Sequence, residues 1–162
     1  MHILVTLKVL FLLTLANGTP VIAKDILGSH FAFPIDVGAK FFDGRPVLGS
    51  SKTFRGIFLS VLVTSAFALI VGMGWKIGVL VASMAMAGDL FSSFLKRRFN
   101  LPAGGRATGL DQVPESLFPL LACRSVMMLT ALDVVVGVAF FCVGELLLSR
   151  LFYHFHLRDH PY

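Results

Sequence analysis

The chain has 162 residues, of which 56% are hydrophobic and only 14% charged, and its formal net charge is +5. Soluble domains typically contain about 45–50% apolar and about 25% charged residues. The composition, with a mean hydropathy of +0.84, therefore excludes an ordinary soluble domain. It predicts an all-α integral membrane protein that forms a single domain over residues 1–162.

Five apolar segments are expected to cross the membrane, at about residues 3–23, 54–71, 77–95, 113–130 and 132–148. Each is close to the ~20 residues that a membrane-spanning helix needs. The first is interrupted by Asn17-Gly18-Thr19-Pro20, which predicts either a polar notch or a kink. The fourth has the weakest pattern because it contains Pro114, Glu115, Pro119 and Arg124.

The basic residues predict how the chain is oriented. Eleven of the 14 Lys and Arg residues fall in two expected loops, about 24–54 and 96–112, at Arg55 directly after the first loop, or in the C-terminal tail. Five crossings place these regions on one side, which the positive-inside rule makes the cytoplasm. We therefore expect a multi-pass cell-membrane protein with its N-terminus outside and its C-terminus and active site cytoplasmic. A secretory signal peptide over the first segment is the alternative.

The positive charge does not predict nucleic acid binding, because the basic residues lie between hydrophobic runs. Topology, lipid headgroups and phosphate substrates account for them better. Cys123 and Cys142 lie in apolar segments and are expected to be small buried hydrophobic residues.

The end of the third segment carries an unusual acidic residue. Asp89 lies about two turns before the basic run Lys96-Arg97-Arg98, too deep for an ordinary surface charge. At helical spacing Asp89, Ser92, Ser93 and Lys96 share one face. Two interpretations stay open here: a metal or phosphate site, or a structural ion pair of Asp89 with Lys96 or Arg124.

A glycine-containing loop follows and ends in a second acid. Gly104, Gly105 and Gly109 accompany Arg106, a combination that lets backbone N–H groups and a guanidinium approach an anion. Asp111 comes next and is either a site carboxylate or an N-terminal helix cap. Glu115 lies one turn later on the same face, as a further metal ligand or base, and Pro114 fits the first turn of a helix.

Residues 49–56 form the other candidate anion site. Gly49, Lys52, Thr53, Arg55 and Gly56 cluster at the start of the second segment, where a helix N-terminus favours negative charge. The alternative is a juxtamembrane basic anchor.

Taken together, these motifs resemble the CDP-archaeol synthase family, which is related to the phosphatidate cytidylyltransferases. The resemblance covers about residues 14–122 and rests on seven motifs in order: Asn17-Gly18-Thr19-Pro20, Pro34-Ile35-Asp36, Asp43-Gly44-Arg45, Gly49 with Lys52-Thr53 and Arg55-Gly56, Gly88-Asp89-Leu90, Ser93-Phe94 with Lys96-Arg97-Arg98, and Leu110-Asp111-Gln112. One departure is that the archaeal pattern has an acid where Pro114 stands, whereas here the acid is Glu115.

The resemblance implies transfer of a cytidylyl group from CTP to a membrane lipid phosphate, with Mg²⁺ as cofactor and pyrophosphate as product. The implied catalytic residues are Asp89, Asp111, Lys96 and Arg97, and the implied metal ligands are Asp89, Asp111 and Glu115. Substrate or cofactor contacts are expected from Lys52, Thr53, Arg55, Ser93, Arg106 and Asn17.

Two other functions are weighed against this one. A CDP-alcohol phosphotransferase also uses metal and Asp residues near a membrane surface, but its Asp-rich pattern does not continue beyond Asp43-Gly44. A non-catalytic lipid-binding membrane protein would not need two acids beside two basic, glycine-containing loops. The identity of the lipid, ether or ester, and the formation of a homodimer are left open.

Overall fold

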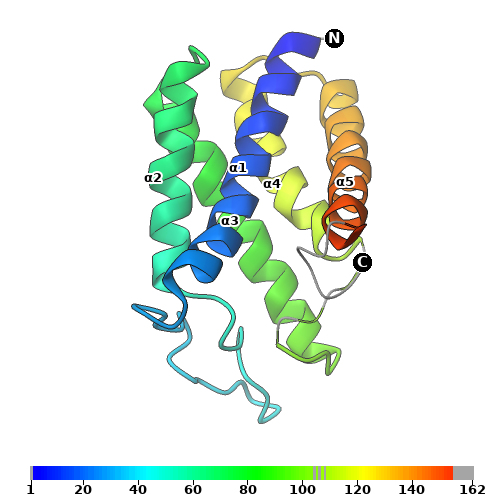
Figure 1. Ribbon diagram of the computed structural model, residues 1–162. Helices are drawn as coiled ribbons and strands as arrows, with labels where there is room; N and C mark the ends of the chain where they lie inside the picture. The colour runs from blue at the N-terminus through cyan, green and yellow to red at the C-terminus, as the bar shows by residue number, and fades with distance from the viewer. Residues whose placement is uncertain (1, 104, 106, 108, 155–162) are drawn as a thin grey trace.

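The computed structural model of the chain describes residues 2–103, 105, 107 and 109–154. Five helices make up the fold: α1 (Ile3–Leu27), α2 (Phe54–Ile70), α3 (Trp75–Arg98), α4 (Gln112–Val126) and α5 (Ala131–His154). The segments that join α1 to α2 and α3 to α4 lie at the end of the bundle opposite the N-terminus (Figure 1). The prediction of an all-α fold with five helices is confirmed.

Helix length separates two groups within the bundle. In the described part of the chain, α1, α3 and residues 131–148 of α5 are long and apolar enough to cross a membrane. The apolar helix α2 has 17 residues and α4 has 15, so at 1.5 Å per residue they measure about 25 and 22 Å, less than the ~30 Å hydrocarbon core. The chain is a multi-pass membrane protein. The fourth predicted segment ends earlier than expected, because the chain turns after Val126 with Met128 at a φ of 52°.

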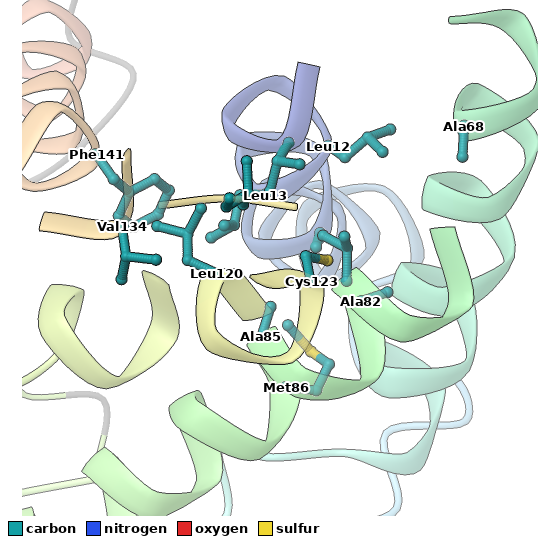
Figure 2. Close-up of a cluster of buried hydrophobic side chains, with 14 residues drawn as sticks. Leu12, Leu13, Ala68, Ala82, Ala85, Met86, Leu120, Cys123, Val134 and Phe141 are labelled. Carbon is teal, nitrogen blue, oxygen red and sulfur yellow. The ribbon is translucent and has the colours of Figure 1, made fainter. Parts of the chain in front are cut away.

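The core of the bundle receives apolar side chains from all five helices. Figure 2 shows ten of them labelled: Leu12, Leu13, Ala68, Ala82, Ala85, Met86, Leu120, Cys123, Val134 and Phe141. Leu12, Leu13 and Leu120 are fully buried, and so is Cys123, as its apolar surroundings in the sequence predict. Small side chains on α2 and α3 allow their backbones to approach closely, which is the usual basis of helix packing in membranes.

Gly78 shows how closely α2 and α3 approach. A Cβ at this position would lie 2.5 Å from the Cα of Ser65 and 2.8 Å from the Cβ of Ala68. Only glycine therefore allows this crossing of the two helices.

Helix α1 continues through Asn17–Pro20, so these residues do not end the first segment. Pro20 has no N–H, so the carbonyl of Ala16 loses its partner within the helix. The hydroxyl of Ser60 on α2 donates to that carbonyl oxygen at 2.7 Å. A tertiary hydrogen bond thus replaces the missing helical one.

We expect Ser60→Ala to destabilise the bundle by about 1–2 kcal/mol, because it leaves the buried Ala16 carbonyl without a donor. Ser65→Ala on the same helix is the matched control, since Ser65 only donates to Val61 one turn earlier. Unfolding of both variants in detergent checks the prediction. Equal stability of the two variants would contradict it.

Candidate active site

A cavity of about 390 Å³ opens at the end of the bundle where the loops lie. It is bounded by the last turns of α1, the first turns of α2, the middle of α3 and loop 28–53. Its polar lining residues are Lys24, Asp25, Ser29, Ser50, Ser51, Lys52, Thr53, Arg55 and Asp89. A cavity of this size with converging polar groups is typical of a small-molecule site.

An ion pair between Lys52 and Asp89 forms one wall of the cavity. The Lys52 Nζ lies 2.5 and 2.6 Å from the two carboxylate oxygens of Asp89, and both side chains are about four-fifths buried. The sequence-based alternative that Asp89 pairs with Lys96 or Arg124 is wrong, because the partner comes from loop 28–53. Removing one member of such a buried pair leaves an uncompensated charge.

Lys52 is held in place by the backbone around it. Its carbonyl accepts from Ile35 N at 2.9 Å, next to an isolated antiparallel bridge between Pro34 and Thr53. Thr53 is the N-cap of α2, and its hydroxyl accepts from Gly56 N at 3.2 Å. The cavity therefore contains both a lysine and the positive end of a helix dipole, a combination that suits anions.

Glu115 of α4 is buried beside Asp89, with the two carboxyl groups within hydrogen-bonding reach. Gly88 makes this possible. A Cβ there would lie 2.5 Å from the carbonyl carbon of Pro114 and 2.8 Å from Glu115 N, and it would come even closer to the carbonyl oxygen of Pro114. The bare backbone of Gly88 lets the first turn of α4 lie directly against α3.

The second acid, Asp111, is not part of this carboxyl pair. Its carboxylate contacts Lys96 Nζ at 2.7 Å and accepts from Ala107 N at 3.1 Å. It occupies the N-cap position of α4 without making a capping hydrogen bond, so the helix-cap interpretation is not supported. Lys96 also donates to Gly105 O at 3.0 Å, which ties the α3–α4 loop to α3.

The other two residues of the basic run also hold loops. Arg97 donates to Pro102 O at 2.8 Å. Arg98 pairs with Asp43 at 2.8 Å and lies over the rings of Phe41 and Phe94, 4.7 and 5.0 Å from their centroids. The run therefore anchors both loops to the end of α3.

The remaining sequence-predicted residues have different environments. Arg55 lines the cavity and also donates to the carbonyls of His30 and Gly28. Ser93 is buried on α3. Both polar side-chain atoms of Asn17 are buried without a hydrogen-bond partner in the described structure. Arg106 lies outside the described residues.

The sequence reasoning missed Glu145 and named Asp36 only as part of a motif, without a role. Glu145 of α5 is close enough to Glu115 to interact with it electrostatically, and its position inside a strongly apolar segment was the available signal. Asp36 organises loop 28–53, because its carboxylate accepts from the backbone N–H groups of Gly49 at 2.8 Å, Leu48 at 3.0 Å and Gly38 at 3.2 Å.

The donor set near Asp89 fits a divalent cation. Two carboxyl groups, from Asp89 and Glu115, lie side by side, and Lys52 forms an ion pair with Asp89. Carboxylates are the ligands that Mg²⁺ prefers in proteins. Within residues 2–103, 105, 107 and 109–154, no group of three or more His, Cys, Asp and Glu side chains is arranged as a metal site.

Comparison with known proteins places the chain in a family. The sequence-family model of the CarS-like CDP-archaeol synthases matches residues 1–77 and 66–162 of the chain. The chain belongs to this family. The CDP-archaeol synthase of Hyperthermus butylicus is 39% identical over 113 residues, which are 66% of this chain and 64% of that protein. That of Pyrococcus furiosus is 40% identical over 107 residues, 60% of each chain. The matches thus span less than two thirds of these curated relatives.

A solved structure gives a broader match. An intramembrane enzyme for archaeal membrane lipid biosynthesis superposes with a TM-score of 0.78 at 27% identity, covering 91% of this chain and 94% of that one. The five-helix architecture of this CDP-archaeol synthase family member is therefore shared over nearly its whole length.

We expect Gly88→Ala to lower the unfolding temperature in detergent, because the added methyl group meets the α4 backbone, which cannot yield as a side chain would. Overpacking of this kind costs about 1–3 kcal/mol. Gly144→Ala on α5 is the matched control, since a Cβ there has nothing within 4 Å. A Gly88→Ala protein as stable as the control would contradict the close packing of α3 and α4.

The pKa of Asp36 gives a prediction about pH. Burial of this carboxyl acts to raise its pKa, but the backbone N–H groups of Gly49, Leu48 and Gly38 outweigh burial and lower it. The ionised Asp36 carboxylate therefore stabilises the folded protein fully at pH values above its unfolded-state pKa of about 3.9. This stabilisation is lost only as the pH falls through the lower folded-state pKa. Amide hydrogen exchange at Leu48 and Gly49 should stay slow down to about pH 4 and be fast in Asp36→Asn. Equal protection in both proteins would refute this role.

Proposed function

We propose that this protein transfers a cytidylyl group from CTP to a membrane lipid phosphate and releases pyrophosphate. The observation that carries the proposal is the cavity wall where Asp89 contacts Lys52 and lies beside Glu115, next to the N-terminus of α2. Membership of the CDP-archaeol synthase family and the likeness to an intramembrane lipid-biosynthesis enzyme support a reaction that forms a CDP-lipid.

The start of α2 is proposed to bind the triphosphate of CTP. Lys52, Thr53 and Arg55 line the cavity there, and the helix dipole adds to the positive potential. Lys52 can pair with phosphate oxygens as well as with Asp89, since an ammonium group has three donors. The cavity thus offers cationic side chains and helix-terminal donors to a polyanion.

The chemical step requires no general base. A phosphate monoester has its second pKa near 6 and is largely ionised at neutral pH. One of its oxygens attacks the α-phosphorus of CTP, a new P–O bond forms, and the bond to the β-phosphate oxygen breaks to release pyrophosphate. The role of the protein is to position the two anions and to compensate their charge.

Mg²⁺ is the proposed cofactor, with Asp89 and Glu115 as the residues that would hold it. Bound there, the ion would supply charge neutralisation to the leaving pyrophosphate. Asp111 stays a predicted ligand whose carboxylate contacts Lys96 in this structure. Glu115 lies beside Asp89, which supports the proposal that Glu115 takes the place of the acid that the archaeal pattern has at position 114.

Lys96 and Arg97 are proposed to act by holding the α3–α4 loop against the site. Their contacts with Asp111, Gly105 and Pro102 support this role. Phosphate contacts from Lys96, Arg97, Ser93 and Arg106 stay predictions. Asn17 is proposed as a substrate-binding residue, since its buried amide atoms have no partner within the described residues.

The proposed lipid substrate is an isoprenoid ether lipid phosphate, as the names of the relatives imply. A phosphatidate-like ester is the second candidate, because the acid shifts from position 114 to Glu115. CTP is a cytoplasmic nucleotide, so the cavity is proposed to face the cytoplasm. That agrees with the basic loops at the same end of the bundle (Figure 1).

We expect purified wild-type protein to release pyrophosphate from CTP only with Mg²⁺ and a lipid phosphate, and chelation of the metal to abolish the release. Asp89→Asn and Asp111→Asn should lower turnover by several orders of magnitude while the protein inserts normally. Asp133→Asn is the matched control, because Asp133 accepts from His2 N at 3.1 Å beside the N-terminus, at the end of the bundle opposite the cavity, and this variant should stay within a few-fold of wild type.

The lipid panel contains an unsaturated ether lipid phosphate, a phosphatidate and a polyprenyl phosphate. The lipid that supports release identifies the substrate class. Near-normal activity in Asp89→Asn would contradict the assigned site. Release of CMP from a CDP-alcohol would instead indicate a phosphotransferase, and CTP binding without turnover on any lipid would favour the non-catalytic alternative.

A further inference from the structure

Loop 28–53 exposes an unusual set of apolar side chains. Phe31, Phe33, Val37 and Phe42, here called the apolar rim, are 75%, 68%, 84% and 99% exposed. Single exposed apolar residues are common on protein surfaces, but several large ones on one loop indicate a surface that meets a partner or a membrane.

The backbone directs two of these side chains outward at a conformational cost. Phe31 has a φ of 56° and Val37 a φ of 47°, and a bulky or β-branched residue in this left-handed region is a genuine outlier. Such strain persists where the surrounding structure requires the conformation. In this loop the strained residues expose their apolar side chains and do not bury them in the core.

The depth of the rim can be measured along α3. Trp75 begins this helix, and Phe94 lies about 28 Å further along its axis at 1.5 Å per residue, close to the thickness of the hydrocarbon core. The ring of Phe41 lies 5.3 Å from that of Phe94 and 5.1 Å from that of Phe42. With Trp75 at one boundary of the hydrocarbon core, Phe42 lies near the level of the other boundary.

The other end of the rim continues the surface of α2. Phe33 O accepts from Phe54 N at 3.1 Å, and Phe54 and Phe58 of α2 are themselves 57% and 67% exposed. Figure 1 shows the loop beside the ends of α1 and α2. Exposed Lys24 and Lys40 add positive charge in this region, which suits anionic headgroups.

We propose that loop 28–53 lies in the membrane–water interface, with the apolar rim inserted among the lipid headgroups of one leaflet. The same segment lines the cavity with Gly28, Ser29, Ala32 and Ile35, so the mouth of the cavity opens at the depth of the headgroups. If the proposed function is correct, a lipid phosphate reaches the site along this loop without leaving the leaflet.

Tryptophan fluorescence in vesicles tests the insertion independently of any activity. Trp75 is the single tryptophan of the chain, so Phe42→Trp and Phe31→Trp are each made in a Trp75→Phe background. The vesicles contain phosphatidylcholine and phosphatidylglycerol, with bromine placed on the acyl chains near the headgroup or near the chain end. Trp75 in the otherwise unchanged chain is the reference for a residue at a helix end.

Insertion predicts stronger quenching by bromine near the headgroup than by bromine near the chain end, together with several-fold protection from aqueous acrylamide. Full accessibility to acrylamide without quenching by brominated lipid would overturn the proposal. So would protection that disappears when the vesicles are diluted to one protein copy each, because a second copy would then cover the rim.

A kinetic experiment tests the delivery of substrate. The double variant Phe31→Ser, Phe42→Ser should raise the KM for a lipid phosphate in vesicles several-fold and leave the KM for CTP unchanged. An unchanged lipid KM would overturn delivery along the loop. If the wild-type protein transfers no cytidylyl group, the proposed function fails while the quenching result still decides whether the loop inserts.

Discussion

Asp89 carries a carboxylate in the middle of an apolar helix, and Lys52 compensates that charge at the wall of the cavity. Lys52 reaches it from a loop 37 positions earlier in the sequence, and Glu115 approaches it from the next helix. Both contacts depend on backbone features: the pairing of Ile35 with Lys52 for the first, and the absence of a side chain at Gly88 for the second. A charge that is expensive to place in a membrane thus has two long-range neighbours in the fold.

The basic residues at the same end perform a second, structural task. Lys96 and Arg97 contact the segment between α3 and α4, whereas Arg98 contacts loop 28–53, so together they fix both loops to the end of α3. The positive-inside pattern in the sequence therefore coincides with a set of loop anchors. The cavity depends on this arrangement, because loop 28–53 supplies most of its polar lining.

Much of the fold could be predicted from the sequence, because the five apolar segments correspond to the five helices. The observed helix ends lie close to the predicted ones, with the larger differences at the C-terminal ends of α1, α4 and α5. The sequence could not show how α1 continues through Asn17–Pro20, because the compensating donor, Ser60, is on another helix. Asp89 was recognised from its depth in an apolar segment. Its partner was not, because pairing across 37 residues depends on how the loop folds back. The close approach at Gly88 likewise appears only when α3 and α4 are packed together.

The proposed reaction joins a nucleotide to a lipid at the membrane surface within one five-helix chain. Transfer of label from CTP to lipid tests it most directly, using purified protein in vesicles that contain the lipid phosphate. With ³²P at the α-phosphate, the account predicts Mg²⁺-dependent label in the organic extract, whereas label at the γ-phosphate stays in the aqueous phase as pyrophosphate. If α-label never enters the lipid fraction although folded protein binds CTP, the protein is not a cytidylyltransferase for these lipids and the assignment of the Asp89 site is wrong.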